Sequence, residues 1–205
     1  MRIETWLATF ALLTIAANLM VVGVWTLVAA ARFSPRAEDL RARVAVTFGL
    51  SGLPFAALVA GVATAGSLYL SEGANLIPCR FCWYQRIGMY PLAVILLVAA
   101  VRRDWGVRPY ALTLAMIGPV ISFYHVLIEH YPWLEKGISC DPFNPCSTNP
   151  VSGYDFPAYG FMKSIPYMAL SGFLLVATLL MVARPADAED DDGSWNDDAS
   201  DQEER

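Results

Sequence analysis

The sequence predicts an all-α, polytopic membrane protein. Of its 205 residues, 56% are hydrophobic and only 16% are charged, whereas a soluble domain carries about 25% charged residues. The mean hydropathy is +0.44. The apolar residues gather in five blocks, each near or above the ~20 residues that a helix needs to cross ~30 Å of hydrocarbon. Composition and block length together exclude an ordinary soluble domain and predict five transmembrane helices.

The transmembrane domain is expected to extend over residues 1–183, with spans at about 5–31, 44–70, 83–101, 110–130 and 164–183. The first block lacks the positively charged start of a signal peptide and is too long for its apolar core, so we expect it to be retained as a helix. In the second block, Pro54 predicts a kink. Gly52, Ala56 and Ala60 lie four residues apart on one face of that block, a pattern that favours close helix packing in lipid.

The C-terminal segment, residues 184–205, differs sharply from the rest. From Asp187 to Arg205 it holds ten acidic residues and one basic residue, so the net charge of −5 becomes +4 when this stretch is left out. A chain of this composition cannot bury enough apolar surface to offset the entropy of ordering it. We therefore expect a disordered acidic tail.

The distribution of basic residues predicts the orientation in the membrane. The segment 32–43, the segment 102–108 and the C-terminal tail share one side and hold nine basic residues, against five on the other side. The more basic side is expected to be cytoplasmic. The N-terminus and all four cysteines then lie on the extracytoplasmic side of the cell membrane, where disulfides persist.

Cys79 and Cys82 stand at the beginning of the third apolar block. A thiol at the start of a helix is close to unpaired backbone amides and to the positive end of the helix dipole. These groups lower the pKa of a thiol and favour the reactive thiolate. Arg86 follows Cys82 by four residues and shares its helix face, so its charge can stabilise a thiolate or an anionic cofactor nearby. Pro78 fixes the chain that leads into the pair.

Cys140 and Cys146 lie in a long, proline-rich segment between the fourth and fifth blocks. Four cysteines permit three disulfide pairings, and the spacing does not choose among them. Three interpretations remain open at this point. The two pairs exchange disulfides with each other, they form two static structural disulfides, or all four thiolates bind a metal ion; an oxidising environment disfavours the last, and no metal is expected.

His125 lies near the outer end of the fourth block, four residues before Glu129. Ionisable residues within a span are candidates for a functional role. A histidine that is simply hydrogen-bonded within the helix bundle is the structural alternative.

The residues around the first cysteine pair resemble a known family. Pro-Cys-x-x-Cys-Trp-Tyr-Gln-Arg-Ile-x-Met-Tyr-Pro, here Pro78 to Pro91, closely resembles the disulfide-bond formation protein B (DsbB) family, in particular its BdbC-type branch. The later stretch that contains Cys140, Cys146, Tyr159-Gly160-Phe161 and Ser164-Ile165-Pro166 is also similar to that branch. The resemblance extends over roughly residues 50–183.

This resemblance implies a four-helix bundle that reoxidises a DsbA-like protein with a thioredoxin fold and passes two electrons to a membrane quinone, a menaquinone or a ubiquinone. By position, Cys79 and Cys82 would be the pair next to the quinone, with Cys82, Arg86 and His125 as its binding residues. Cys140 would accept the partner's thiolate and Cys146 would exchange with Cys79. No nucleic acid partner is expected.

The chain departs from the family pattern in two ways. The first block is an extra N-terminal transmembrane helix beside the bundle, and the Cys140–Cys146 loop is more compact than in the best-known branch, which weakens the case for a large loop movement. Two alternatives to the thiol:quinone oxidoreductase remain open. One is a quinone reductase similar to vitamin K epoxide reductase, and the other is a non-enzymatic membrane protein with structural disulfides. The run Trp83 to Arg86 favours the oxidoreductase over the first alternative.

Overall fold

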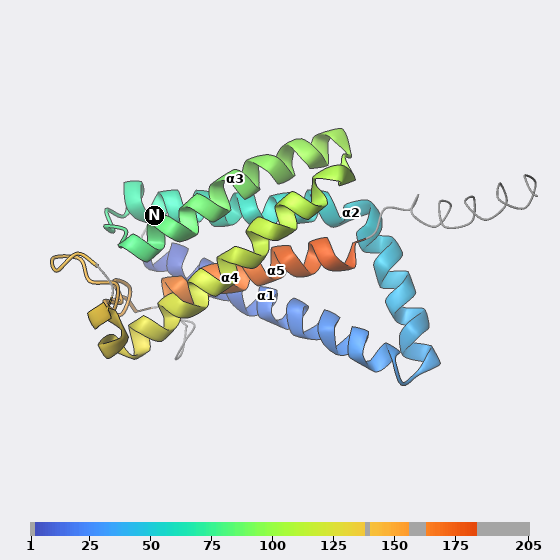
Figure 1. Ribbon diagram of the computed structural model, residues 1–205, viewed down its shortest axis with the longest axis horizontal. Helices are drawn as coiled ribbons and strands as arrows, with labels where there is room; N and C mark the ends of the chain where they lie inside the picture. The colour runs from blue at the N-terminus through green and yellow to red at the C-terminus, as the bar shows by residue number, and fades with distance from the viewer. Residues whose placement is uncertain (1–2, 138–139, 156–162, 184–205) are drawn as a thin grey trace, which may run out of the picture.

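The computed structural model describes residues 3–137, 140–155 and 163–183. The predicted tail at 184–205 and the family-like Tyr159-Gly160-Phe161 lie outside the described residues. Five long helices dominate the described part and run roughly along one axis (Figure 1). They are α1 (Ile3–Ala31), α2 (Pro35–Leu68), α3 (Arg80–Arg102), α4 (Arg108–His130) and α5 (Ile165–Val182).

All five helices are long and apolar enough to cross a membrane. The segments that meet both criteria are Ile3–Ala31, Ser51–Gly73, Arg80–Arg102, Trp105–His130 and Ile165–Val182. Within the described residues no β-strand forms, and the one β-bridge joins Asp141 to Asn144. The prediction of an all-α, polytopic membrane protein is confirmed.

Helix α2 begins earlier than the span predicted at 44–70. Ser34 has an extended backbone (φ −141°, ψ 123°) and precedes Pro35, whose fixed φ suits the first turn of a helix. The charged residues after it are therefore helical rather than a loop, and Arg41 pairs with Glu38 one turn before it. Figure 1 shows α2 bent, with its N-terminal arm directed away from the bundle. Pro54 lies inside this helix and has no amide hydrogen for the preceding turn, which accounts for a bend.

Small residues allow the helices of the bundle to approach one another closely. A Cβ atom at Gly118 of α4 would lie 2.2 Å from the Phe173 ring of α5, which is fully buried in the core. A Cβ atom at Gly52 of α2 would lie 2.4 Å from the Cβ of Ala183. Ala56 and Ala60 are both 0% exposed, so the stripe seen in the sequence is a packing surface.

The chain between α2 and α3 carries the first cysteine pair to one end of the bundle. A π-helical turn, Tyr69–Gly73, extends α2, and Asn75 then adopts a left-handed conformation (φ 55°), which asparagine tolerates better than most residues. After α4, the 3₁₀-helix Pro132–Gly137 leads into the second pair. The start of α3, the end of α4 and segment 140–155 thus lie at the same end (Figure 1).

Candidate active site

Cys79 and Cys82, the helix pair, are free thiols at the start of α3. Cys79 is the N-cap residue, and its Sγ accepts a hydrogen bond from the backbone amide of Cys82 at 3.4 Å. The two Sγ atoms are 3.0 Å apart. The cap brings the two sulfurs together because residue 82 is the third residue of the helix. The placement of this pair at a helix start agrees with the sequence analysis.

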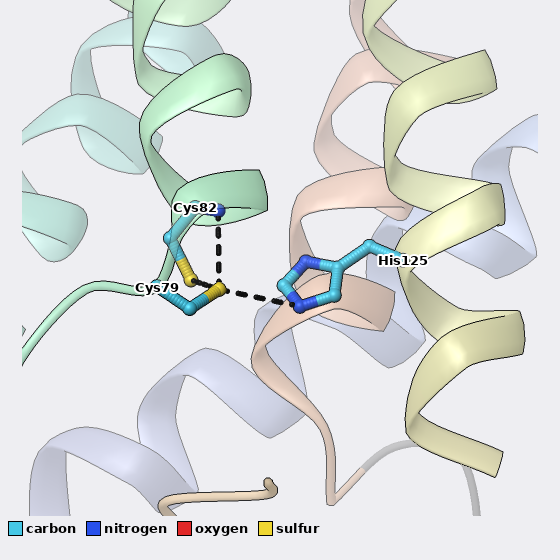
Figure 2. A group of neighbouring side chains, drawn as sticks. All are labelled: Cys79, Cys82 and His125. Carbon is cyan, nitrogen blue, oxygen red and sulfur yellow. Dashed lines mark hydrogen bonds between the residues drawn. The ribbon is translucent and has the colours of Figure 1, made fainter. Parts of the chain in front are cut away.

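His125 reaches the helix pair from α4 (Figure 2). Its Nε2 lies 3.5 Å from the Sγ of Cys79 and 3.2 Å from the carbonyl oxygen of Cys146. The side-chain amide of Gln85 faces Nδ1 at 3.4 Å. With that amide as the donor, the ring carries its hydrogen on Nε2 and directs it to Cys79 and Cys146. His125 is only 2% exposed, so the ring is held within protein.

The surroundings of Cys79 favour its thiolate. The hydrogen bond with the Cys82 thiol is the main cause that lowers the pKa of the Cys79 thiol from 9.0 to about 4; burial opposes it, and the His125 ring lowers the pKa further. The thiolate is the form of cysteine that attacks disulfides and leaves from them. Cys79 is therefore suited to thiol–disulfide exchange at neutral pH.

We expect the Cys79 thiolate to persist in mildly acidic solution. Protein with a reduced helix pair should keep the ultraviolet absorbance of a thiolate below neutral pH and lose it as the pH falls through about 4. The Cys79→Ser variant supplies the baseline for this titration. A midpoint near the ordinary thiol value of about 8.5 would contradict the assignment.

Cys140 and Cys146, the loop pair, form a disulfide with a Cα–Cα distance of 6.1 Å. The structure thus selects one of the three pairings that the sequence left open. Cys146 is 1% exposed and packs with Cys79, Phe81 and Ile128 in one buried cluster. Cys140 lies at the edge of this cluster and is partly exposed. The disulfide also removes two of the four thiolates that the metal-site interpretation required.

Glu135 fastens the loop pair, a role that the sequence analysis missed. Its carboxylate accepts hydrogen bonds from the backbone amide of Cys146 at 2.6 Å and from the hydroxyl of Ser147 at 2.5 Å. Its oxygen lies within 4.8 Å of both loop-pair sulfurs. The side chain of Asn144 adds a weaker link, since it donates to the carbonyl oxygen of Ile77 at 3.4 Å. The loop pair is therefore tied both to the 3₁₀-helix Pro132–Gly137 and to the chain before α3.

Arg86 is held against α2. Its Nε donates to the hydroxyl of Ser67 at 3.0 Å, and its Nη2 donates to the Ser67 carbonyl oxygen at 2.9 Å. The guanidinium also lies over the Trp83 ring, 5.3 Å from the centroid. The sequence predicted a cation one turn below Cys82, but its partner Ser67 was not predicted. These contacts fix the position of the charge.

An apolar cavity of about 380 Å³ borders this arginine. Cys82, Gln85 and Arg86 contribute polar groups to its wall, and most of the other lining residues are apolar. The family resemblance grouped His125 with Cys82 and Arg86 as residues that bind the quinone. In the structure His125 contacts Cys79 and Cys146 instead, and it is not among the described residues that line the cavity.

Comparison with known proteins decides the family. The family model described as "Disulfide bond formation protein DsbB" matches residues 51–183. The chain belongs to the DsbB family. This membership confirms the resemblance seen in the sequence, and it assigns the chain a role in disulfide bond formation with the chemistry of a disulfide oxidoreductase. Helix α1 and the N-terminal arm of α2 lie outside the matched residues.

Curated relatives from several bacteria are similar to more than half of this chain. "Disulfide bond formation protein C" of Bacillus subtilis is 40% identical over 133 residues, which cover 64% of this chain and 91% of that protein. A "Probable disulfide formation protein" of Oceanobacillus iheyensis is 41% identical over 60% of this chain and 82% of its own length. One of Metapseudomonas resinovorans is 38% identical over 62% of this chain and 85% of its own length. No solved structure matches the chain.

Proposed function

We propose that this DsbB-family chain is a membrane thiol:quinone oxidoreductase that reoxidises an extracytoplasmic, DsbA-like dithiol oxidase and passes the electrons to a membrane quinone. The observation that carries the proposal is the contact between the two cysteine pairs. Cys146 of the bonded loop pair packs with Cys79 of the reduced helix pair, and Cys82 borders the apolar cavity. Two purely structural disulfides would not leave Cys79 and Cys82 as free thiols in contact.

The loop pair is the proposed point of reaction with the partner. A thiolate of the partner attacks the Sγ of Cys140, and Cys146 leaves as a thiolate. The second thiol of the partner then displaces Cys140, so the partner becomes a disulfide and the loop pair becomes two thiols. Two electrons and two protons have then passed to the chain. The partial exposure of Cys140, against 1% for Cys146, supports Cys140 as the sulfur that is attacked.

The second proposed reaction passes the electrons from the loop pair to an oxidised helix pair. The Cys146 thiolate attacks the Sγ of Cys79 and expels Cys82, after which Cys140 attacks Cys146 and expels Cys79. Because a thiol of low pKa leaves faster, the pKa of about 4 at Cys79 favours the last displacement. The products are a bonded loop pair and a reduced helix pair, the oxidation states present in the structure.

The cavity beside Cys82 fits a lipophilic quinone, whether menaquinone or ubiquinone. Small-molecule sites are mostly apolar, with a few polar groups that orient the ligand, and Cys82, Gln85 and Arg86 meet that description here. A bound quinone would supply the acceptor for the two electrons and two protons released when the helix pair returns to a disulfide. Arg86 would hold a fixed positive charge beside it, where negative charge develops.

The direct test is an assay with purified full-length protein, a quinone and a reduced thioredoxin-fold dithiol protein. We expect the partner to become oxidised and the quinone to become reduced in equal amounts. The Cys140→Ser variant should stop both reactions because it removes the sulfur that the partner attacks. Absence of quinone-dependent oxidation in the unmodified protein would overturn the proposal.

The proposed orientation places the N-terminus and both cysteine pairs outside the cytoplasm and the C-terminus inside. A membrane-impermeant thiol label should therefore reach reduced Cys140 in intact cells. As a matched control, a Ser34→Cys variant that lacks the four native cysteines tests the turn between α1 and α2, and it should be labelled only after lysis. The reverse pattern would contradict the orientation.

A further inference from the structure

We infer that α1, the helix outside the DsbB match, forms the wall of the quinone site that receives the apolar tail of the quinone. The inference rests on the proposed function and extends it to a helix to which the family comparison assigns no role. Residues of α1, α2, α3 and α5 surround the cavity beside Cys82. The wall from α1 includes Phe10, Leu13, Thr14, Ala17 and Met20.

Helix α1 is packed onto the bundle as a specific partner of α2 and α5. Its buried residues, Leu7, Ala11, Thr14 and Ala17, recur every three or four positions and form one face. The side chain of Asn18 donates to the Tyr167 hydroxyl at 3.3 Å, and the Trp25 indole donates to the Thr178 hydroxyl at 3.1 Å. These two bonds, about two turns apart on α1, fix its position along α5.

Helices α1 and α2 approach each other closely at the wall of the cavity. A Cβ atom at Gly66 would lie 2.8 Å from the ring of Phe10, and both residues line the cavity. The absence of a side chain at residue 66 therefore admits the aromatic ring as part of the wall. An α1 that served only as a membrane anchor would not require this close fit.

The chemistry of the lining identifies the occupant. The polar groups of Cys82, Gln85 and Arg86 come from α3, whereas α1 contributes mainly hydrocarbon surface. A ligand that presents a redox-active ring to Cys82 and hydrocarbon to α1 is a quinone with a long apolar tail. A phospholipid acyl chain shares the hydrocarbon chemistry, but it offers no group for the thiol to reduce. The continuity of the cavity with Cys82 therefore favours the quinone.

The test fills the α1 wall with Ala17→Phe in the full-length protein. The control is Leu19→Phe, on the same helix, where the side chain is 69% exposed. Two quantities are measured: long-tail quinone retained per protein after purification, and the ratio of KM for a long-tail quinone to KM for a tail-less one. We expect Ala17→Phe to lower retention and raise the KM ratio by about fivefold or more, since tail methylene groups lose buried contact. The control should match the unmodified protein.

Each outcome bears on the inference. Unchanged retention and an unchanged KM ratio in Ala17→Phe would overturn it, and so would recovery of phospholipid in place of quinone from the unmodified protein. If Ala17→Phe does not give monodisperse protein, Ala17→Leu makes a smaller change in the same direction and is judged by the same measurements. Reduction of tail-less quinone by the unmodified protein keeps the proposed function intact when the α1 inference fails. Failure of the unmodified protein to bind or reduce any quinone would overturn both the α1 inference and the proposed function.

Discussion

Replacing Cys82 with serine should abolish steady-state quinone reduction, by a factor of about 10³ or more, because the variant loses a group that forms and breaks a covalent bond in each cycle. The helix pair could no longer close to a disulfide, so electrons delivered to the chain would have no onward route. The loop disulfide would remain, and it should still oxidise one equivalent of reduced partner. The expected result is a single stoichiometric burst of partner oxidation without turnover.

Stopped-flow or quenched single-turnover measurements distinguish this burst from general loss of structure. Tyr84→Phe provides a matched control, since Tyr84 lies two residues further along α3 and is 43% exposed. That variant should turn over like the unmodified protein. Steady-state turnover that survives in Cys82→Ser would show that the assigned electron path is wrong.

Replacing Arg86 with leucine should raise the KM for quinone by about 10- to 100-fold, the range that corresponds to loss of a hydrogen bond from a charged group. The guanidinium is positioned by two bonds to Ser67 and by the Trp83 ring. Leucine keeps the apolar volume but removes the charge from the cavity wall. Exchange between the partner and the loop pair should continue at its normal rate in a single turnover.

Two further variants show whether charge or geometry matters at this position. Arg86→Lys keeps the charge but cannot make both hydrogen bonds to Ser67. Its KM for quinone should therefore fall between that of the unmodified protein and that of Arg86→Leu. Arg80→Leu removes an exposed charge from the first residue of the same helix and should leave the KM near that of the unmodified protein. An unaltered KM in Arg86→Leu would remove the role assigned to this residue.

The sequence predicted the position of the helix pair well, for a local physical reason. Pro78, the two cysteines and the apolar run that follows them define a helix start without reference to the rest of the chain. The position of His125 near one end of its span was also predicted, because the rise per residue of a helix fixes how far along the span a residue lies. The contacts of His125 could not be predicted, since they depend on the packing of α4 against α3.

The disulfide pairing and the role of Glu135 could not be predicted from the sequence. Segment 132–146 has no helical or strand periodicity, so spacing does not determine which side chains meet. Glu135 is an acidic residue close to Cys140 in sequence, but its bonds to Cys146 and Ser147 arise from the path of the loop. Gln85 stood within the recognised motif, yet its contact with His125 joins two helices.

The packing position of α1 against the other helices could not be predicted from the sequence either. A membrane helix is apolar on the faces that meet lipid and on those that meet protein, so hydrophobicity does not mark its packing face. The polar residues Asn18 and Trp25 bond to α5, but nothing in the sequence names their partners. The start of α2 at Pro35 was missed because charged residues outside the bilayer were interpreted as a loop.

The burial of the two central sulfurs bears on side reactions with small molecules. Cys146 is 1% exposed and Cys79 is 7% exposed, whereas Cys140 is partly open and Cys82 borders the cavity. In the proposed cycle, electrons therefore enter at Cys140 and leave at Cys82, while the sulfurs of Cys146 and Cys79, which pass them on, are buried. In that cycle, a small thiol in the surrounding solution would compete with the partner at Cys140, the more exposed sulfur of the loop pair. Burial of Cys79 and Cys146 would thereby protect the exchange between the two pairs from small reductants, and the choice of electron donor would depend on what docks at Cys140.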